Sequence, residues 1–216
     1  MEENRRRLFA LVNELRRKIS KGPLRARDIE DATKRLKQLG KSYKDETFPE
    51  LLDTNTWKDE SSNSPKGLAE ALLWKLGRWK AYRNFANYYA DDQSKPRNGI
   101  VFYAFARHLK NPNKNPMFDQ HSLRALWAIC PNLTPEEEEK CKNYLIGTQD
   151  RWKGSGSGTS AAECYNIFKK RLKSLITKSG ADTLRELDRL LMPLGQAIRE
   201  HTKNYREFDR LHRNRT

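Results

Sequence analysis

One segment of the chain stands out from an otherwise plain pattern of apolar and charged residues. It runs from a glycine turn at Gly99 through an apolar stretch and the proline-rich loop 111–116 to Asp119. His121 and Arg124 follow, so a carboxylate, an imidazole and a guanidinium stand close together in sequence. Such groups can stabilise charge, transfer protons or bind phosphate. Asp119 also has a structural interpretation, because Asp directly before a helix is a preferred N-cap. Both interpretations are open.

The order of these features resembles the helix-hairpin-helix DNA glycosylase superfamily. In that family a hairpin glycine leads into a helix, a loop follows, and a catalytic Asp stands in an Asp-x-His-x-x-Arg pattern. Asp119, His121 and Arg124 match this pattern, and Gly99 takes the place of the hairpin glycine. The resemblance is specific over residues 95–127. Within the superfamily the chain looks most like branches linked to modified phage bases, among them the glutamyl/putrescinyl-thymidine pyrophosphorylase group and glycosylases of bacterial anti-phage defence.

The chain departs from the family pattern in three respects. The usual hairpin reads Leu-Pro-Gly-x-Gly, whereas the segment 94–99 reads SKPRNG. Members that also cut the strand carry a Lys just after the hairpin, where this chain has Ile100 and Val101. The four-cysteine iron–sulfur motif of some members is absent. The resemblance therefore implies a monofunctional enzyme that needs no cofactor and leaves an abasic site.

The resemblance gives Asp119 the catalytic role. Hydrolysis of an N-glycosidic bond passes through a state with positive charge on the sugar, which a carboxylate stabilises while it orients the attacking water. His121 is expected to lie at the substrate pocket and to brace the start of the helix by a hydrogen bond. Arg124 is expected either to hold a DNA phosphate or to form a structural ion pair.

Aromatic residues are concentrated before and within this segment. A base that leaves the DNA stack needs aromatic faces in its pocket, and the candidates are Trp74, Trp79, Tyr82, Tyr88, Tyr89, Phe102 and Tyr103. Aromatics at helical spacing are also typical of a core. We interpret part of the set as the lining of a cleft, because Tyr88 and Tyr89 are adjacent and are not expected to point inward together.

The charge balance favours a polyanionic partner, with double-stranded DNA as the expected one. The chain has 43 Lys and Arg against 28 Asp and Glu, a formal net charge of +15. Each phosphate that is neutralised releases condensed counterions, which favours binding. The candidate DNA contacts are Lys95, Arg97, Asn98, Gly99, Arg124, Lys153, Gly154 and Ser155.

The glycine-rich stretch 154–158 has two interpretations. It lacks the Gly-Lys-Ser/Thr ending of a nucleotide-binding loop, so a flexible linker is one of them. The other is a clamp on one backbone phosphate, because the helix that follows would present free amides at its N-terminus.

Little in the sequence points to metal, secretion or a membrane. The three cysteines, Cys130, Cys141 and Cys164, show no metal-ligand spacing, and we expect free thiols in a reducing compartment. We expect neither a metal nor a cofactor. No segment has the length and apolar character of a signal peptide or a membrane span. We therefore expect a cytoplasmic monomer that does not bind membranes.

Helical periodicity covers most of the chain and predicts an all-α, compact bundle in two lobes with a cleft. We expect one domain, 1–216, with possible lobes 66–150 and 1–65 plus 151–216. The expected helices carry apolar residues over 8–19, 29–39, 66–90, 100–109 and 119–129. Three more are expected from Pro135, around 165–176 and from Asp182, the last with a kink or break at Pro193.

Three functions follow from these features. The first is a DNA glycosylase that acts on a flipped modified base, with a role in defence against phages with modified DNA. The second is a non-catalytic nucleic-acid-binding protein. The third is a nucleotide-level enzyme of hypermodified-pyrimidine metabolism.

Overall fold

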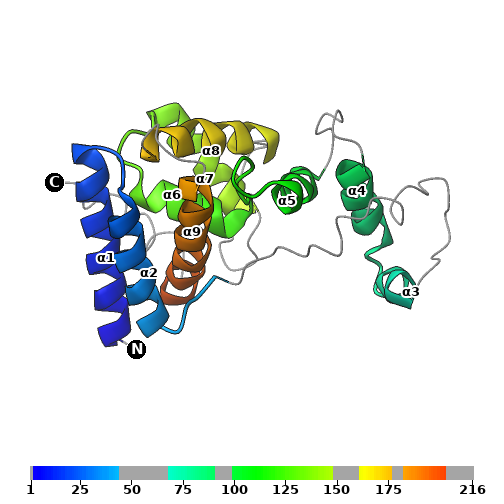
Figure 1. Cartoon of the computed structure of the whole chain (residues 1–216), viewed down its shortest axis with the longest axis horizontal. Coiled ribbons are helices and arrows are strands. Elements are labelled where there is room, and N and C mark those ends of the chain that lie inside the picture. Colours follow the sequence, from blue (N-terminus) through cyan, green and yellow to red (C-terminus); the bar gives the residue numbers. More distant parts are fainter. Residues whose placement is uncertain (1, 44–67, 91–98, 148–160, 177–181, 203–216) are drawn as a thin grey trace. The chain divides into compact units, whose positions relative to one another are not determined.

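The computed structural model describes residues 2–43, 68–90, 99–147, 161–176 and 182–202. Apart from one isolated bridge between Leu24 and Ile176, the regular structure in these ranges is helical, which confirms the all-α class for them. The helices are α1 (Glu2–Lys21), α2 (Ala26–Gln38), α3 (Leu68–Lys75), α4 (Trp79–Ala90), α5 (Ile100–Lys110), α6 (Gln120–Ile129), α7 (Pro135–Gly147), α8 (Ala161–Leu175) and α9 (Asp182–His201) (Figure 1). None of these helices is long and apolar enough to cross a membrane.

Packing divides the chain into two compact units. The larger unit combines Met1–Asp45 with Phe118–Thr216, and the smaller unit is Glu46–Met117. The sequence instead suggested a lobe boundary near residue 150. The difference has a physical reason, because α6 and α7 bury their apolar faces against α8 and α9 and so belong with the C-terminal helices.

Helix α6 forms the centre of the larger unit. It contacts α1, α7, α8 and α9, and every residue from Ser122 to Ile129 is buried. A helix that is covered all round must lie in the interior. The neighbouring α9 contributes apolar residues that recur every three or four positions and are fully buried: Leu187, Leu190, Leu191, Leu194, Ala197 and Ile198.

Helix α9 continues through Pro193 to His201, so the chain does not break at this proline. Two residues further on, Gly195 allows an unusually close backbone approach. A Cβ atom at this position would lie 1.9 Å from the carbonyl oxygen of His121. Only glycine fits there, because any side chain would overlap the start of α6. The contact fixes α9 against the residues at the N-terminus of α6.

The end of α2 brings another residue to the same region. Gly40 adopts a left-handed conformation with φ of 73°, and the Lys41 amide donates to the Leu36 carbonyl at 2.9 Å. Together with the bond from the Gly40 amide to the Lys37 carbonyl, this is the Schellman motif typical of a helix that ends at a glycine. It directs the chain away from α2 at Lys41, whose side chain forms an ion pair with Glu200 of α9.

The smaller unit contains α3, α4 and α5. A single helix over 66–90 is wrong, because Gly77 adopts a left-handed conformation with φ of 68° and separates α3 from α4. The Arg78 amide donates to the Leu73 carbonyl at 2.8 Å and closes the end of α3. Helices α4 and α5 pack on each other around an aromatic core.

Candidate functional site

The N-terminus of α6 is built around Asp119. Its Oδ1 accepts hydrogen bonds from the backbone amides of His121 at 2.7 Å and Ser122 at 2.8 Å. The Ser122 hydroxyl accepts in return from the Asp119 amide at 2.9 Å, which completes a capping box. The N-cap interpretation is therefore confirmed.

The capping role occupies only one oxygen of the Asp119 carboxylate. No hydrogen bond to Oδ2 is formed by the residues that the structure describes, and the side chain is partly exposed. The helix amides hold Oδ1 in a fixed direction and favour negative charge at this end of α6. Because the bonds to Oδ1 fix the carboxylate, Oδ2 has a defined orientation and forms no hydrogen bond with the described residues.

Behind Asp119, the buried side chain of Arg124 and the half-buried side chain of His121 join α6 to α9. Arg124 is fully buried, and its Nη1 lies 3.3 Å from the Gly195 carbonyl oxygen and 3.1 Å from Nδ1 of His121. Since a guanidinium can only donate, we assign Nδ1 of His121 as the acceptor. The proton of the neutral imidazole then resides on Nε2. His121 thus braces the start of α6, as the sequence suggested.

Burial and nearby cations shape the charge state of this pair. Burial lowers the pKa of His121, and Arg124 and Arg199 lower it further, while Asp119 and a hydrogen bond with the Gly195 backbone oppose the shift. Burial also lowers the pKa of Arg124 to about 10, with Arg199 adding to the effect and Asp119 opposing it. Arg124 remains cationic at neutral pH, whereas a neutral His121 is favoured.

The buried position of Arg124 corrects one prediction. The sequence left two roles for this side chain, a contact to DNA phosphate or a structural ion pair. A fully buried guanidinium that bonds to the Gly195 carbonyl cannot reach a DNA backbone at the surface. Arg124 therefore has a structural role, as a bridge between α6 and α9, and is removed from the DNA contacts.

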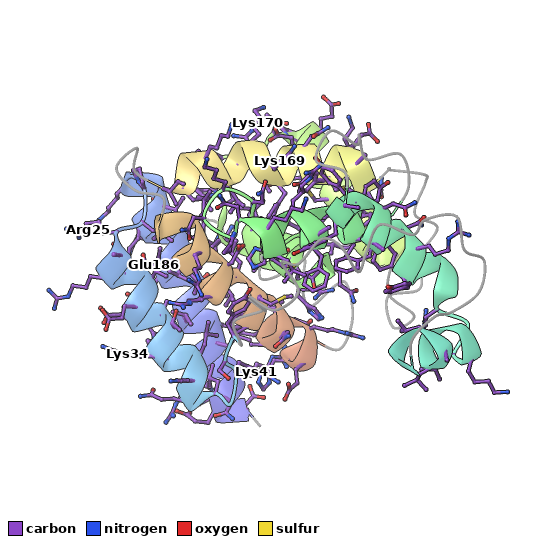
Figure 2. The ribbon with its side chains drawn as sticks, turned by 45° about the vertical axis from the view of Figure 1, so that its right-hand side comes forward. Arg25, Lys34, Lys41, Lys169, Lys170 and Glu186 are labelled. Carbon is purple, nitrogen blue, oxygen red and sulfur yellow. The ribbon has the colours of Figure 1, made fainter. Side chains whose placement is uncertain are left out.

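A polar pocket lies beside this bridge, within the larger unit. It has a volume of about 350 Å³ and is lined by Lys41, His121, Gln196, Arg199 and Glu200. Three separate segments supply these side chains: the turn after α2, the start of α6 and the last part of α9. Figure 2 shows Lys41 where α2 ends, next to the end of α9. His121 thus lines a pocket, and its place in a substrate pocket stays a prediction.

Aromatic residues of α4 and α5 form a core between these two helices in the smaller unit. Tyr88 and Tyr89 are both buried, with exposed fractions of 9% and 1%. The argument that they could not both point inward is wrong, because Tyr89 packs against Phe85 and Tyr88 against Tyr103 within one aromatic core. Neither tyrosine is available to a base, and both are removed from the pocket candidates.

The other aromatic candidates remain open. Tyr82, Phe102 and Tyr103 are partly exposed, and Phe102 packs closely on Gly99, where an added Cβ would lie 2.8 Å from its ring. The side chains of Trp74 and Trp79 lie outside the described part of the structure.

The expected glycine turn before α5 is present. Gly99 is the N-cap of α5, with φ of 65° in the left-handed region, and it is exposed. The remaining candidate DNA contacts, Lys95, Arg97, Asn98, Lys153, Gly154 and Ser155, lie outside the described residues.

The three cysteines, Cys130, Cys141 and Cys164, are free and buried. The neighbouring Cys164 thiol and burial both raise the pKa of Cys141, and the Cys164 thiol donates to the Lys140 carbonyl. Such thiols are packing groups. Over the described ranges, no group of three or more His, Cys, Asp or Glu side chains could hold a metal ion.

Sequence reasoning missed most of the pocket. Lys41, Gln196, Arg199 and Glu200 carry no local signal, since folding alone brings them to His121. Gly195 had a signal, because a glycine inside an apolar helix often marks a close contact. Comparison of the chain with protein-family models, curated proteins and solved structures returned no match.

Proposed function

We propose that this protein is a monofunctional DNA glycosylase that removes a modified base, with Asp119 as its catalytic carboxylate. One observation carries the proposal. The helix amides fix Oδ1 of Asp119 while no described residue bonds to Oδ2, and the same turn of chain places His121 at a polar, cationic pocket. The net charge of +15 supports DNA as the substrate.

The geometry suits hydrolysis of an N-glycosidic bond in the following way. As the bond from the sugar to the base breaks, the base departs with the bonding electrons and positive charge develops on the sugar. Oδ2 of Asp119 stabilises this charge and orients a water molecule towards the sugar carbon. The water oxygen bonds to that carbon and gives up one proton, the departing base takes up one proton from solvent, and the products are the free base and an abasic site.

The buried bridge behind Asp119 would make this carboxylate rigid. Arg124 bonds to both His121 and Gly195, and the His121 amide bonds to Asp119. A carboxylate held by the packing of two helices loses little entropy when it meets the developing charge, which is the advantage of a preorganised site. In this proposal Arg124 and Gly195 are positioning residues.

A non-catalytic nucleic-acid-binding protein is the second candidate. Two observations favour it: the capping box explains an Asp at position 119 without catalysis, and Tyr88 and Tyr89 belong to a core. This candidate predicts salt-sensitive DNA binding with no abasic product from any DNA.

A base-release assay separates the two candidates. DNA from phages with modified cytosine or thymine and ordinary DNA would each be treated with wild type and with Asp119→Asn, and abasic sites scored as alkali-sensitive breaks. Asn is as good an N-cap as Asp, so the variant is expected to fold. Breaks with wild type alone support the glycosylase, whereas a folded wild type that binds every DNA and breaks none supports the second candidate.

A further inference from the structure

The pocket lined by Lys41, His121, Gln196, Arg199 and Glu200 carries positive charge that its own residues do not neutralise. Lys41 and Glu200 form an ion pair and cancel each other. The side chain of Arg199 is exposed and forms no hydrogen bond or ion pair with the described residues, so its charge remains. A second cation, Arg124, is buried behind His121.

The neighbouring titratable groups respond to this positive potential. Arg199 lowers the pKa of His121 and of Arg124, after burial as the larger cause for both. Asp119 is the acid that opposes the shift in each case. An anion in the pocket would relieve the repulsion between Arg199 and the cation behind it.

The side chains that face the pocket are suited to donate hydrogen bonds. The His121 ring lines the pocket but is already engaged, because its Nδ1 accepts from Arg124 and the ring also bonds to the Gly195 backbone. The Gln196 amide adds two N–H groups, and the Arg199 guanidinium presents a planar fork of donors. A fork beside other donors matches the oxygens of a phosphate better than it matches a spherical anion.

We infer that this pocket binds a phosphate group, with Arg199 and Gln196 as donors, Lys41 as a nearby cation and His121 in its wall. A volume of about 350 Å³ leaves room for the sugar to which the phosphate is attached. The phosphate belongs either to a nucleic-acid backbone or to a free nucleotide. The site does not depend on base removal, so it stands or falls separately from the glycosylase proposal.

The test is calorimetric titration of the full chain with inorganic phosphate, with thymidine 5′-monophosphate and with a short DNA duplex. Arg199→Gln removes the unneutralised charge, and Gln196→Glu places an acid in the pocket. Arg27→Gln is the matched control, because Arg27 is an exposed arginine on α2 that does not line the pocket. Circular dichroism checks that each variant keeps the helical content of wild type.

We expect Arg199→Gln to weaken binding of phosphate and nucleotide about tenfold, as loss of a charge-assisted hydrogen bond implies. Gln196→Glu is expected to abolish that binding, and Arg27→Gln to leave it unchanged. If Arg199→Gln also weakens duplex binding more than Arg27→Gln does, the bound phosphate is that of a DNA backbone. If the two variants bind the duplex equally well, the bound phosphate is that of a free nucleotide. The inference is overturned if wild type binds neither phosphate nor nucleotide, or if Arg199→Gln binds them as well as wild type.

Discussion

Replacement of Gly195 by alanine tests whether the contact between α9 and the start of α6 holds the site together. In an ordinary helix this change stabilises, since Ala is better than Gly by about 1 kcal/mol. Here the added Cβ would lie 1.9 Å from the carbonyl oxygen of His121 and 2.5 Å from its carbonyl carbon. Carbon and oxygen atoms in contact are normally about 3.3 Å apart. The helices must therefore separate by more than about 1 Å.

The cost follows from what such a separation disturbs. Both obstructing atoms belong to the backbone, so no side chain can rotate away. The face of α9 around Gly195 is fully buried at Leu194 and Ile198, so the separation disrupts a packed core. Overpacking of this kind costs about 1–3 kcal/mol, and we expect Gly195→Ala to lower the free energy of unfolding by about 2 kcal/mol.

Urea unfolding followed by circular dichroism measures this change, and a thermal melt should show a midpoint lower by about 4–8 °C. Arg199→Ala is the control, because it places alanine at an exposed position of the same helix and should stay within about 0.5 kcal/mol of wild type. A Gly195→Ala protein that is as stable as wild type, or more stable, would refute the close approach.

Three further predictions concern protonation and burial. Because burial lowers the pKa of His121, the imidazole binds a proton more readily in the unfolded chain than in the folded one. Acidification below about pH 6.5 should therefore destabilise wild type more than it destabilises His121→Gln. Urea unfolding midpoints at about pH 7.5 and 5.5 measure the difference. Burial raises the pKa of Glu137, but hydrogen bonds from Arg171, Lys170 and Thr134 outweigh burial and lower it overall. The ionised Glu137 therefore stabilises the fold above its ordinary pKa, and this stabilisation is lost as pH falls through its lowered pKa in the folded state. Glu137→Gln should reduce the loss of stability below pH 4.5, and an unchanged pH profile of stability would contradict this. The three buried cysteines should react with a disulfide reagent such as Ellman's reagent only after addition of denaturant, and rapid reaction in buffer would show that they are accessible.

The sequence predicted the starts of helices well where a capping residue marked them. Asp119 caps α6, and Thr134 accepts from the Glu137 amide at the start of α7. These signals are local, because a cap bonds to amides two or three residues away. The break at Gly77 was missed because apolar residues continue on both sides of it and periodicity alone does not reveal a left-handed glycine.

The candidate site was predictable only in part. Asp119 and His121 were found because they lie together in sequence within a recognisable pattern. The role of Arg124 was left open between a DNA contact and a structural one, because sequence does not show which face of α6 is covered, and in the structure α6 is covered all round. Arg199 and Lys41 reach the pocket only through the packing of α9 and the turn after α2, which are contacts between distant segments.

The most direct test of the central claim is the single-turnover rate of base release from modified phage DNA by wild type, Asp119→Asn and Ser122→Ala. Ser122→Ala loosens the capping box but leaves the carboxylate in place, so it controls for effects on the helix start. We predict that Asp119→Asn lowers the rate by at least about a hundredfold, while Ser122→Ala stays within about tenfold of wild type. Equal rates for wild type and a folded Asp119→Asn, or equal losses in both variants, would contradict a catalytic role for the carboxylate.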